Sequence, residues 1–205
     1  MIPTTKTESK LLKSNYHFNP FAGVLDVEVK HTIVPRFSIA EIVTEIETKQ
    51  SIAIEFLGKH GRGKTTHLIW LQQQLPQYPI FQLGKTANYT EVLQHVSEVV
   101  FVDGIHHLSF KERVQLFKTK RVVVYTTHFT RKLACLFAQK KQKVIRFKGI
   151  DTHTLQQIIT NRLALAQTDF REPTAHFSES ELQKLINRYG DNYRGIINNL
   201  YENYQ

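Results

Sequence analysis

The stretch Gly58-Lys59-His60-Gly61-Arg62-Gly63-Lys64-Thr65-Thr66 limits the possible folds of this chain more than any other. It matches Gly-x-x-x-x-Gly-Lys-[Ser/Thr], in which glycines let backbone N–H groups surround phosphate oxygens, the lysine reaches the β and γ phosphates and the hydroxyl binds Mg²⁺. A strand predicted over 51–57 precedes the loop, and a helix predicted over 66–75 follows it with its N-terminus toward the phosphates. A Gly-rich turn can match by chance, but this context favours a P-loop. We therefore expect residues 58–66 to bind ATP and Thr65 to bind Mg²⁺.

A second landmark is Val99-Val-Phe-Val-Asp103, four apolar residues followed by a carboxylate. This pattern is typical of a buried parallel strand, and the carboxyl ends of such strands form the edge of the sheet where ligands bind. About forty residues after a P-loop, Asp103 is expected to hold Mg²⁺ through water, as the aspartate of a Walker B motif does. The alternative is an aspartate that only caps a helix.

The rest of the chain predicts an α/β fold. Further strands are expected at 79–83, 121–127 and 144–147, alternating with helices, whereas the chain beyond 151 has only helical patterns. Ser38 with Glu41 and Ser178 with Glu181 have the spacing of capping boxes. We predict a five-stranded parallel P-loop sheet with helices on both faces, followed by a small helical lid. The expected domains are an N-terminal arm and linker (1–35), the nucleotide-binding core (36–150) and the lid (151–205).

The positive charge is concentrated in one segment. Of the formal net charge of +9, residues 111–148 contribute twelve Lys and Arg against the single acidic residue Glu112. Such a segment favours a polyanion, most simply duplex DNA bound through its phosphates without regard to sequence. A solvated basic face without a partner is the alternative. The lysines predicted to lie in loops or at helix ends, and therefore to contact DNA, are Lys118, Lys120, Lys140, Lys141 and Lys143.

The order of these landmarks resembles that of AAA+ ATPases, over roughly residues 36–204. The resemblance rests on the P-loop, the strand ending in Asp103, a strand ending in Thr126-Thr127, a short strand, and a helical lid containing Gly190-Asp-Asn-Tyr-Arg194. It implies a homo-oligomer in which Thr127, or as second choice Thr126, is sensor 1. It also implies that Arg194 is sensor 2, above the γ-phosphate, with a plain surface arginine as the alternative.

The same resemblance implies an arginine finger between sensor 1 and the fifth strand. Arg131 is the first candidate and Lys132 the next, and a structural salt bridge is the alternative. The segment Val102-Asp-Gly-Ile-His-His-Leu108 is similar to the Asp-Glu-Ile-His-x-Leu signature of small AAA+ proteins that serve DNA transposition and related systems. Where that family has the glutamate that activates water, this chain has Gly104. Weak hydrolysis is therefore expected unless Glu55 or Glu98 replaces it.

The leading functional hypothesis is an AAA+ ATP-binding protein that oligomerises with ATP and acts on DNA as a regulator or loader, together with a partner protein. A non-catalytic ATP-binding adaptor is the first alternative, and Gly104 favours it. A small P-loop kinase is the second, although such kinases usually have an arginine-rich lid and this C-terminal region is slightly acidic. The single Cys135 lies in an apolar run and predicts a core residue. No apolar run has the length of a signal or membrane-spanning segment, so a cytoplasmic protein is expected.

Overall fold

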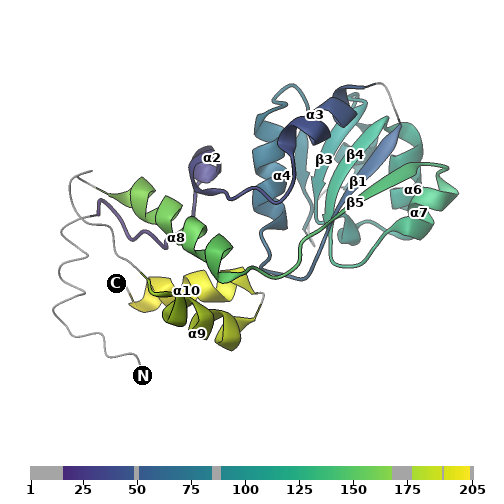
Figure 1. The fold of residues 1–205 in the computed structure, drawn as a ribbon. Helices are drawn as coiled ribbons and strands as arrows, with labels where there is room; N and C mark the ends of the chain where they lie inside the picture. The colour runs from purple at the N-terminus through teal and green to yellow at the C-terminus, as the bar shows by residue number, and fades with distance from the viewer. Residues whose placement is uncertain (1–15, 49–50, 85–88, 168–176, 191, 204–205) are drawn as a thin grey trace. The chain divides into compact units, whose positions relative to one another are not determined.

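The computed structural model describes residues 16–48, 51–84, 89–167, 177–190 and 192–203. The chain divides into two compact units (Figure 1). One unit is Pro35–Phe147, and the other combines Met1–Val34 with Lys148–Gln205. Each unit is described by itself.

The Pro35–Phe147 unit is built on a five-stranded, fully parallel sheet with the strand order β2-β3-β4-β1-β5. The sheet confirms the predicted fold class. Because all strands run in one direction, Leu57, Asp103 and Thr127 end their strands at the same edge. The strands are β1 (Ile52–Leu57), β2 (Ile80–Gln82), β3 (Val99–Asp103), β4 (Val122–Thr127) and β5 (Lys141–Arg146).

The fifth strand differs from its prediction. It was expected over 144–147, but it begins at Lys141, where backbone pairing with Ile52 of β1 starts. Three consecutive polar residues, Lys141-Gln142-Lys143, begin this edge strand and hide it from a search for apolar runs, since an edge strand of a parallel sheet is less covered than a central one. As a result, Lys141 and Lys143 lie within a strand and not in the predicted loop.

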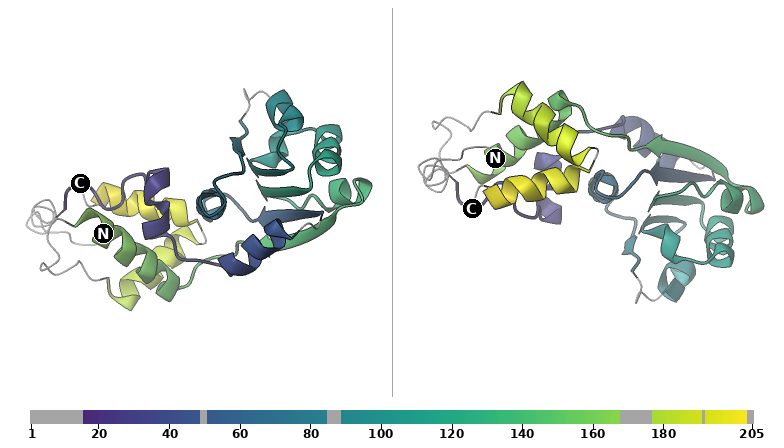
Figure 2. Two further views of the ribbon diagram at one scale, coloured as in Figure 1. Left: turned by 90° about the horizontal axis from the view of Figure 1, so that it is seen from above. Right: turned by 90° about the horizontal axis from the view of Figure 1, so that it is seen from below.

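Helices cover both faces of the sheet (Figure 2). Ile54 and Phe56 of β1 point to the face packed by α3 (Ile39–Glu47) and α4 (Lys64–Gln73). Ala53 of the same strand points to the other face, in agreement with the period of two residues in a strand. The helices on that second face are α5 (Tyr89–Gln94), α6 (Phe110–Thr119) and α7 (Lys132–Phe137), preceded by the 3-10 turn η2 (Ile105–His107).

Helix starts follow the side chains that the sequence offers. The Ser38 hydroxyl accepts the backbone N–H of Glu41 at 3.4 Å, one of the two hydrogen bonds of the predicted capping box, and α3 ends at Glu47. A capping box that the sequence reading did not identify begins α6, with the Ser109 backbone donating to the Glu112 carboxylate at 2.6 Å. These contacts satisfy N–H groups of the first helical turn, which have no partner within the helix.

The second unit is helical. Its core joins Phe21 to buried side chains of the C-terminal helices, among them Leu155 and Ile196. The predicted capping box at Ser178 is present, with both reciprocal hydrogen bonds to Glu181. Its elements are η1 (Asp26–Glu28), α2 (Val29–Thr32), α8 (Thr152–Ala166), α9 (Glu179–Tyr189) and α10 (Tyr193–Asn203). The two short helical elements η1 and α2 lie within the segment predicted as an N-terminal arm and linker.

Arg162 connects the N-terminal segment to α8. It is 8% exposed, and its guanidinium donates to the carbonyl of Ala22 at 3.0 Å and to the Tyr193 hydroxyl at 3.0 Å. Asn19 donates to the carbonyl of Tyr201 at 3.1 Å, so the segment also contacts α10. Most of the predicted polar arm, residues 1–15, lies outside the described residues.

Among the helices described, none is both long and apolar enough to cross a membrane.

Candidate nucleotide-binding site

The P-loop connects β1 to α4 at the carboxyl edge of the sheet, as predicted. Gly63, at the cap of α4, has φ 79°, a left-handed conformation that a side chain would strain. Lys64 follows as the first residue of the helix and is 7% exposed. Its ammonium group donates to the carbonyl of Lys59 at 2.7 Å, so the loop closes on its own lysine.

Three oxygen-bearing side chains meet beside this lysine (Figure 1 shows the strands β3 and β4 and the helix α4 that carry them). The Thr65 hydroxyl lies 3.0 Å from each carboxylate oxygen of Asp103. The Thr126 hydroxyl donates to Asp103 Oδ1 at 2.5 Å and accepts the backbone N–H of Gly104 at 2.9 Å. A hydroxyl and a carboxylate are the oxygen ligands that Mg²⁺ prefers, so Thr65 and Asp103 fit the metal predicted for them.

Two side chains in and next to the P-loop donate hydrogen bonds to backbone carbonyls of the Pro35–Phe147 unit. His67 is buried, and its Nδ1 donates to the carbonyl of Gly63 at 2.8 Å. Arg62 Nη1 donates to the carbonyl of Phe147 at 2.8 Å. This contact holds Arg62 against the end of β5, although the sequence placed it with the nucleotide-binding residues. His67 lies four residues after Gly63, about one helical turn along, and this spacing could have predicted its contact with Gly63.

The remaining P-loop residues lie along the same turn. Lys59 and His60 are exposed, whereas Gly58, Gly61 and Thr66 are half-buried. The Gly58 backbone N–H donates to the carbonyl at the end of β4, which holds the start of the loop to the sheet.

A cluster of histidine rings surrounds the outer side of the P-loop. The His60 and His128 rings lie 3.7 Å apart between centroids, and the His106 ring is 5.0 Å from that of His128. The His128 Nδ1 donates to the carbonyl of Gly58 at 3.1 Å, and Lys64 Nζ lies 3.5 Å from the same nitrogen. These rings come from three segments that are distant in sequence, so no local pattern predicts the cluster.

Two histidines of the cluster have lowered pKa values. Burial, and the nearby charges of His107, His128, Arg131 and His60, lower the pKa of His106 to about 4. Burial also lowers the pKa of His128, although its hydrogen bond to the Gly58 carbonyl acts in the opposite direction. The His106 Nδ1 is buried, and among the described residues it has no hydrogen-bond partner. No group of three or more His, Cys, Asp or Glu in the described part of the chain is arranged to hold a metal ion.

The backbone conformation of Gly104 disfavours any residue with a side chain at this position. Its φ of 79° and ψ of 41° are left-handed, and it forms the cap of η2. A Cβ at this position would lie 2.9 Å from the carbonyl oxygen of Leu83 and 3.2 Å from the His107 ring. The space next to Gly104 is therefore filled by backbone and by histidine.

The two carboxylates considered as replacements have other partners. Glu55 is fully buried on the α7 face, where Oε1 accepts the Tyr125 hydroxyl at 3.2 Å and the Arg131 N–H at 2.7 Å. Glu98 precedes β3 and lies 3.5 Å from Arg121 Nε. Because a strand rises about 3.3 Å per residue, Glu98 is separated from Asp103 by roughly 16 Å along β3.

The threonines at the end of β4 differ in their contacts. Thr126 contacts Asp103, as described above, whereas the Thr127 hydroxyl donates to the carbonyl of Phe129 at 2.9 Å and accepts Arg131 Nε at 3.1 Å. Arg131 is thus held by a hydroxyl of its own chain. Arg194 is exposed in the first turn of α10, within the other unit, and Asp191 lies outside the described residues.

The structure corrects the predicted set of DNA-contacting lysines. Lys120 and Lys140 are only 6% and 7% exposed. Lys120 Nζ donates to the carbonyl of His95, and Lys140 Nζ donates to the carbonyls of Phe117 and Lys120 at 2.9 and 2.6 Å. Both lysines are therefore structural, and their assignment to DNA is wrong.

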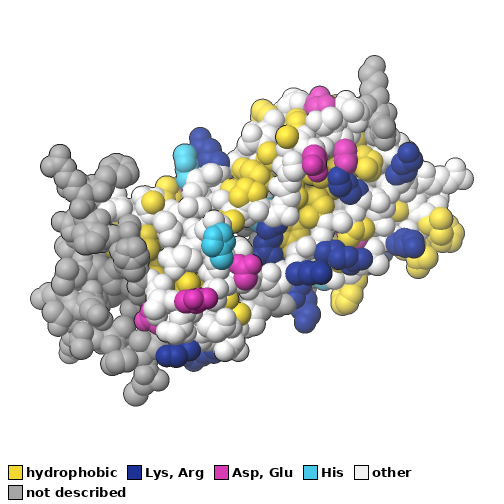
Figure 3. Space-filling model, viewed as in Figure 1, with side chains coloured by type: hydrophobic (Ala, Val, Ile, Leu, Met, Phe, Trp, Pro, Cys, Tyr) yellow, Lys and Arg dark blue, Asp and Glu magenta, His cyan; other side chains and the backbone are white. Residues whose placement is uncertain are grey.

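Two other lysines of the predicted DNA-contacting set are exposed to solvent. Lys118 on α6 and Lys141 on β5 are exposed, whereas Lys143 is half-buried and forms an ion pair with Glu45 at 2.5 Å. On the face shown in Figure 3, Lys and Arg side chains gather over the unit that contains the sheet, with hydrophobic side chains among them. Burial lowers the pKa of Lys140 to about 8 and also lowers that of Lys120.

Comparison with solved structures places this fold among known ones. A DNA replication initiation factor aligns over 84% of this chain with a TM-score of 0.52 and 13% identity. The RuvB Holliday junction branch migration motor of Thermotoga maritima aligns over 82% with a TM-score of 0.52 and 14% identity. The chain spans 62% and 61% of the lengths of these two proteins. At such identities the likeness shows a shared fold.

No protein-family model matches the sequence. No curated protein matches it either.

Proposed function

We propose that this chain is an AAA+ protein that binds ATP with Mg²⁺ and acts on DNA. The observation that carries the proposal is the contact between Thr65 and Asp103 at the carboxyl edge of the sheet, with the Thr65 hydroxyl 3.0 Å from each carboxylate oxygen and Lys64 next to Thr65 in the chain. In this proposal residues 58–66 surround the phosphates, and Thr65 and Asp103 hold Mg²⁺, which neutralises phosphate charge when bound. Thr126, by fixing the Asp103 carboxylate, orients it toward the hydroxyl of Thr65.

Hydrolysis is proposed to be slow. General-base assistance contributes about 10²–10⁴ in rate, and position 104 has no side chain to supply it. Glu55 is engaged by Tyr125 and by the backbone of Arg131, which supports the same conclusion. The proposal also assigns three roles: sensor 1 to Thr127, the arginine finger to Arg131 and sensor 2 to Arg194. In the same proposal the protein forms an ATP-dependent homo-oligomer.

The role on DNA is supported by charge and by the fold. Both named structural neighbours are proteins of DNA metabolism by their own descriptions. In this proposal the exposed lysines Lys118 and Lys141 contact DNA phosphates. The protein acts on DNA as a regulator or loader. A non-catalytic adaptor that binds ATP for structure is the second candidate, and the left-handed Gly104 favours it.

Nucleotide binding is tested by thermal-shift titration with Mg-ATP. The wild type should be stabilised as ATP rises, and Asp103→Asn should lose most of the Mg²⁺-dependent part while it keeps its hydrogen bond to Thr126. Equal stabilisation of both proteins, with and without Mg²⁺, would contradict the assignment. Size-exclusion chromatography with ATP then reports assembly, and measured turnover separates a slow ATPase from an adaptor.

DNA binding is tested by the salt dependence of duplex affinity. Each phosphate contact adds about −0.9 to the slope of log affinity against log salt. The double variant Lys118→Glu, Lys141→Glu should flatten this slope, whereas the matched variant Lys184→Glu, on exposed α9, should not. An unchanged slope in the double variant would show that these lysines form a solvated face.

A further inference from the structure

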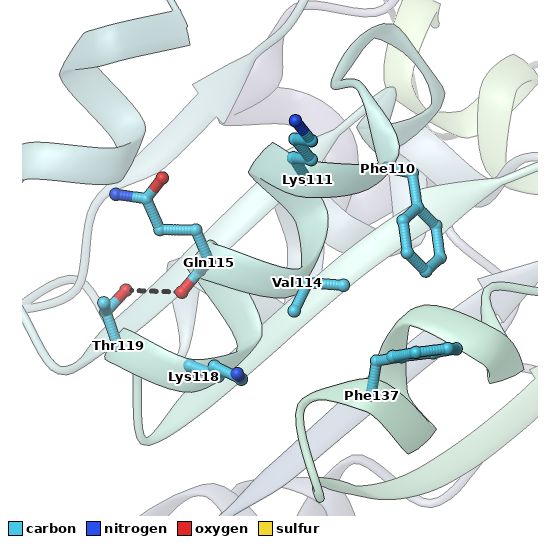
Figure 4. Close-up of a pocket in the computed structure, with 7 residues that line it drawn as sticks. All are labelled: Phe110, Lys111, Val114, Gln115, Lys118, Thr119 and Phe137. Carbon is cyan, nitrogen blue, oxygen red and sulfur yellow. Dashed lines mark hydrogen bonds between the residues drawn. The ribbon is translucent and has the colours of Figure 1, made fainter.

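An apolar groove lies between α6 and α7, on the face of the sheet unit covered by these helices (Figure 4). Its volume is about 370 Å³, and its apolar walls come from Phe110 and Val114 of α6 and Phe137 of α7. The two phenylalanine rings meet edge to face, with centroids 5.5 Å apart. A groove of this size lies near the lower end of the range of ligand pockets, about 300–1,000 Å³, and accommodates one or two large side chains.

The apolar surface continues along α7. Phe137 is 63% exposed, and Leu133 and Leu136 on the same helix are 66% and 67% exposed. Residues three and four apart share one helical face, so these three side chains form a single stripe. The opposite side of α7 buries Ala134 and Cys135 in the core, which is why the helix packs with this stripe outward. Soluble proteins rarely leave contiguous apolar patches exposed unless they bind something.

The charge around the groove has one sign. Lys111 and Lys118 of α6 line it, and among the seven residues described as lining it none is acidic. The close-up in Figure 4 shows both lysines on the helix that carries Phe110 and Val114. The nearest acidic residue in sequence, Glu112, is engaged by the backbone of Ser109 at 2.6 Å. An occupant must therefore offer apolar groups together with negative charge.

We propose that the α6–α7 groove binds an acidic segment of a partner protein, which inserts a large apolar side chain between Phe110 and Phe137. Carboxylates of the segment would pair with Lys111 and Lys118. The exposed leucines favour a protein over a nucleic acid, because aliphatic side chains neither stack on bases nor contact phosphates. The aromatic residues of the groove are of the type that dominates binding at protein interfaces. This inference does not rest on ATP or DNA binding, but it shares Lys118 with the proposed DNA contacts, so an acidic segment and DNA would compete for this lysine.

The test begins with selection from a randomised peptide-display library on the full chain. Peptides rich in Asp and Glu around Phe, Leu or Trp are expected, and their affinities are then measured by fluorescence anisotropy. Phe137→Ser should weaken binding by about tenfold or more, since interface anchors contribute on this scale. The double variant Lys111→Glu, Lys118→Glu should shift the preference toward basic peptides. The matched control is Val96→Ser, another exposed apolar side chain, 94% exposed and away from the groove.

Three results would overturn the proposal. The first is a selection without acidic enrichment, or acidic peptides that bind Phe137→Ser and wild type equally. The second is duplex or single-stranded DNA whose binding depends on Phe137, which would make the groove a nucleic-acid site. The third is self-association that is lost in Phe137→Ser while no peptide is selected, which would assign the surface to a second copy of the chain. A thermal unfolding curve of Phe137→Ser confirms that a loss of binding is not a loss of folding.

Discussion

The two ends of the parallel sheet both gather cationic side chains but give them different partners. At the carboxyl end, the ammonium group of buried Lys64 donates to the Lys59 carbonyl at 2.7 Å and lies 3.5 Å from His128 Nδ1, and the next residue, Thr65, contacts Asp103. At the amino end, buried Lys140 is enclosed by the carbonyls of Phe117 and Lys120 and by the Ser51 hydroxyl at 3.0 Å. Lys120 and Arg121 there also donate to backbone carbonyls.

The difference teaches how to separate a structural cation from a functional one. A lysine surrounded by backbone carbonyls completes the hydrogen bonding of groups that cannot move, because buried carbonyls need a donor. Lys64 donates to a single carbonyl, that of Lys59, and in the proposed function it would exchange this contact for phosphate oxygens when ATP binds. Burial alone does not distinguish the two, since Lys64 and Lys140 are equally buried at 7% exposure.

The strongest test of this contrast is Lys64→Ala. The substitution removes the cation that is proposed to contact the phosphates, and a charge-assisted hydrogen bond contributes about 1.5–3 kcal/mol, so ATP affinity should fall roughly 10- to 100-fold. Isothermal titration with Mg-ATP measures it. The unfolding free energy without nucleotide should change much less than ATP affinity, and the reverse pattern would contradict the assignment.

The converse is expected for Lys140→Met. Loss of the ammonium group leaves the Phe117 and Lys120 carbonyls without this donor, and an unsatisfied buried polar group costs about 1–3 kcal/mol. Chemical denaturation should show this loss, while ATP affinity stays unchanged. Lys141→Met, at the exposed neighbouring position, is the matched control and should be nearly neutral. Stability equal to that of the control would show that Lys140 is not structural.

Gly104→Glu tests whether the left-handed backbone conformation at position 104 disfavours a side chain. A residue with a side chain at φ 79° costs about 1–2 kcal/mol, and here the new Cβ would also crowd the Leu83 carbonyl at 2.9 Å. We expect destabilisation without a gain in ATP turnover, because the backbone must shift to make room for the new Cβ and the glutamate is then not held at the site. Gly84→Ala, where a Cβ meets nothing within 4 Å, is the control. A rise in turnover at unchanged stability would be inconsistent with the left-handed conformation.

The smallest expected effect concerns pH. The folded pKa of His106, about 4, lies below its ordinary value of 6.5, so only the unfolded chain binds a proton between these values. The melting temperature should therefore fall as pH drops from about 6.5 to about 4. His106→Gln should flatten this dependence, whereas His153→Gln, at an exposed position of α8, should leave it intact. The groups facing His106 are His60, His107, His128 and Arg131.

The local parts of this molecule were predictable from sequence, and the long-range parts were not. The P-loop, the strand ending in Asp103 and the Ser178 capping box follow from residue types at short spacings. The enclosure of Lys140 depends on α6, β1 and β4 meeting at one point, and nothing near Lys140 in sequence signals it. The histidine cluster likewise forms only after folding. The left-handed conformation of Gly104 also could not be predicted, because it depends on the residues packed around it in the fold.

The contacts of Arg162 have a practical consequence for shortening the protein. Because this buried guanidinium donates to the Ala22 carbonyl, and Asn19 donates to Tyr201, the segment around 19–22 is part of the helical unit formed mainly by residues near the other terminus. A deletion that starts the chain at Pro35 would remove Phe21 from that unit's core and leave Arg162 buried without these acceptors. Trimming should also preserve Tyr16 and His17, which pair with Gln167 and Ala166 at the end of α8, so the tolerable cut site lies well before the boundary suggested by sequence alone.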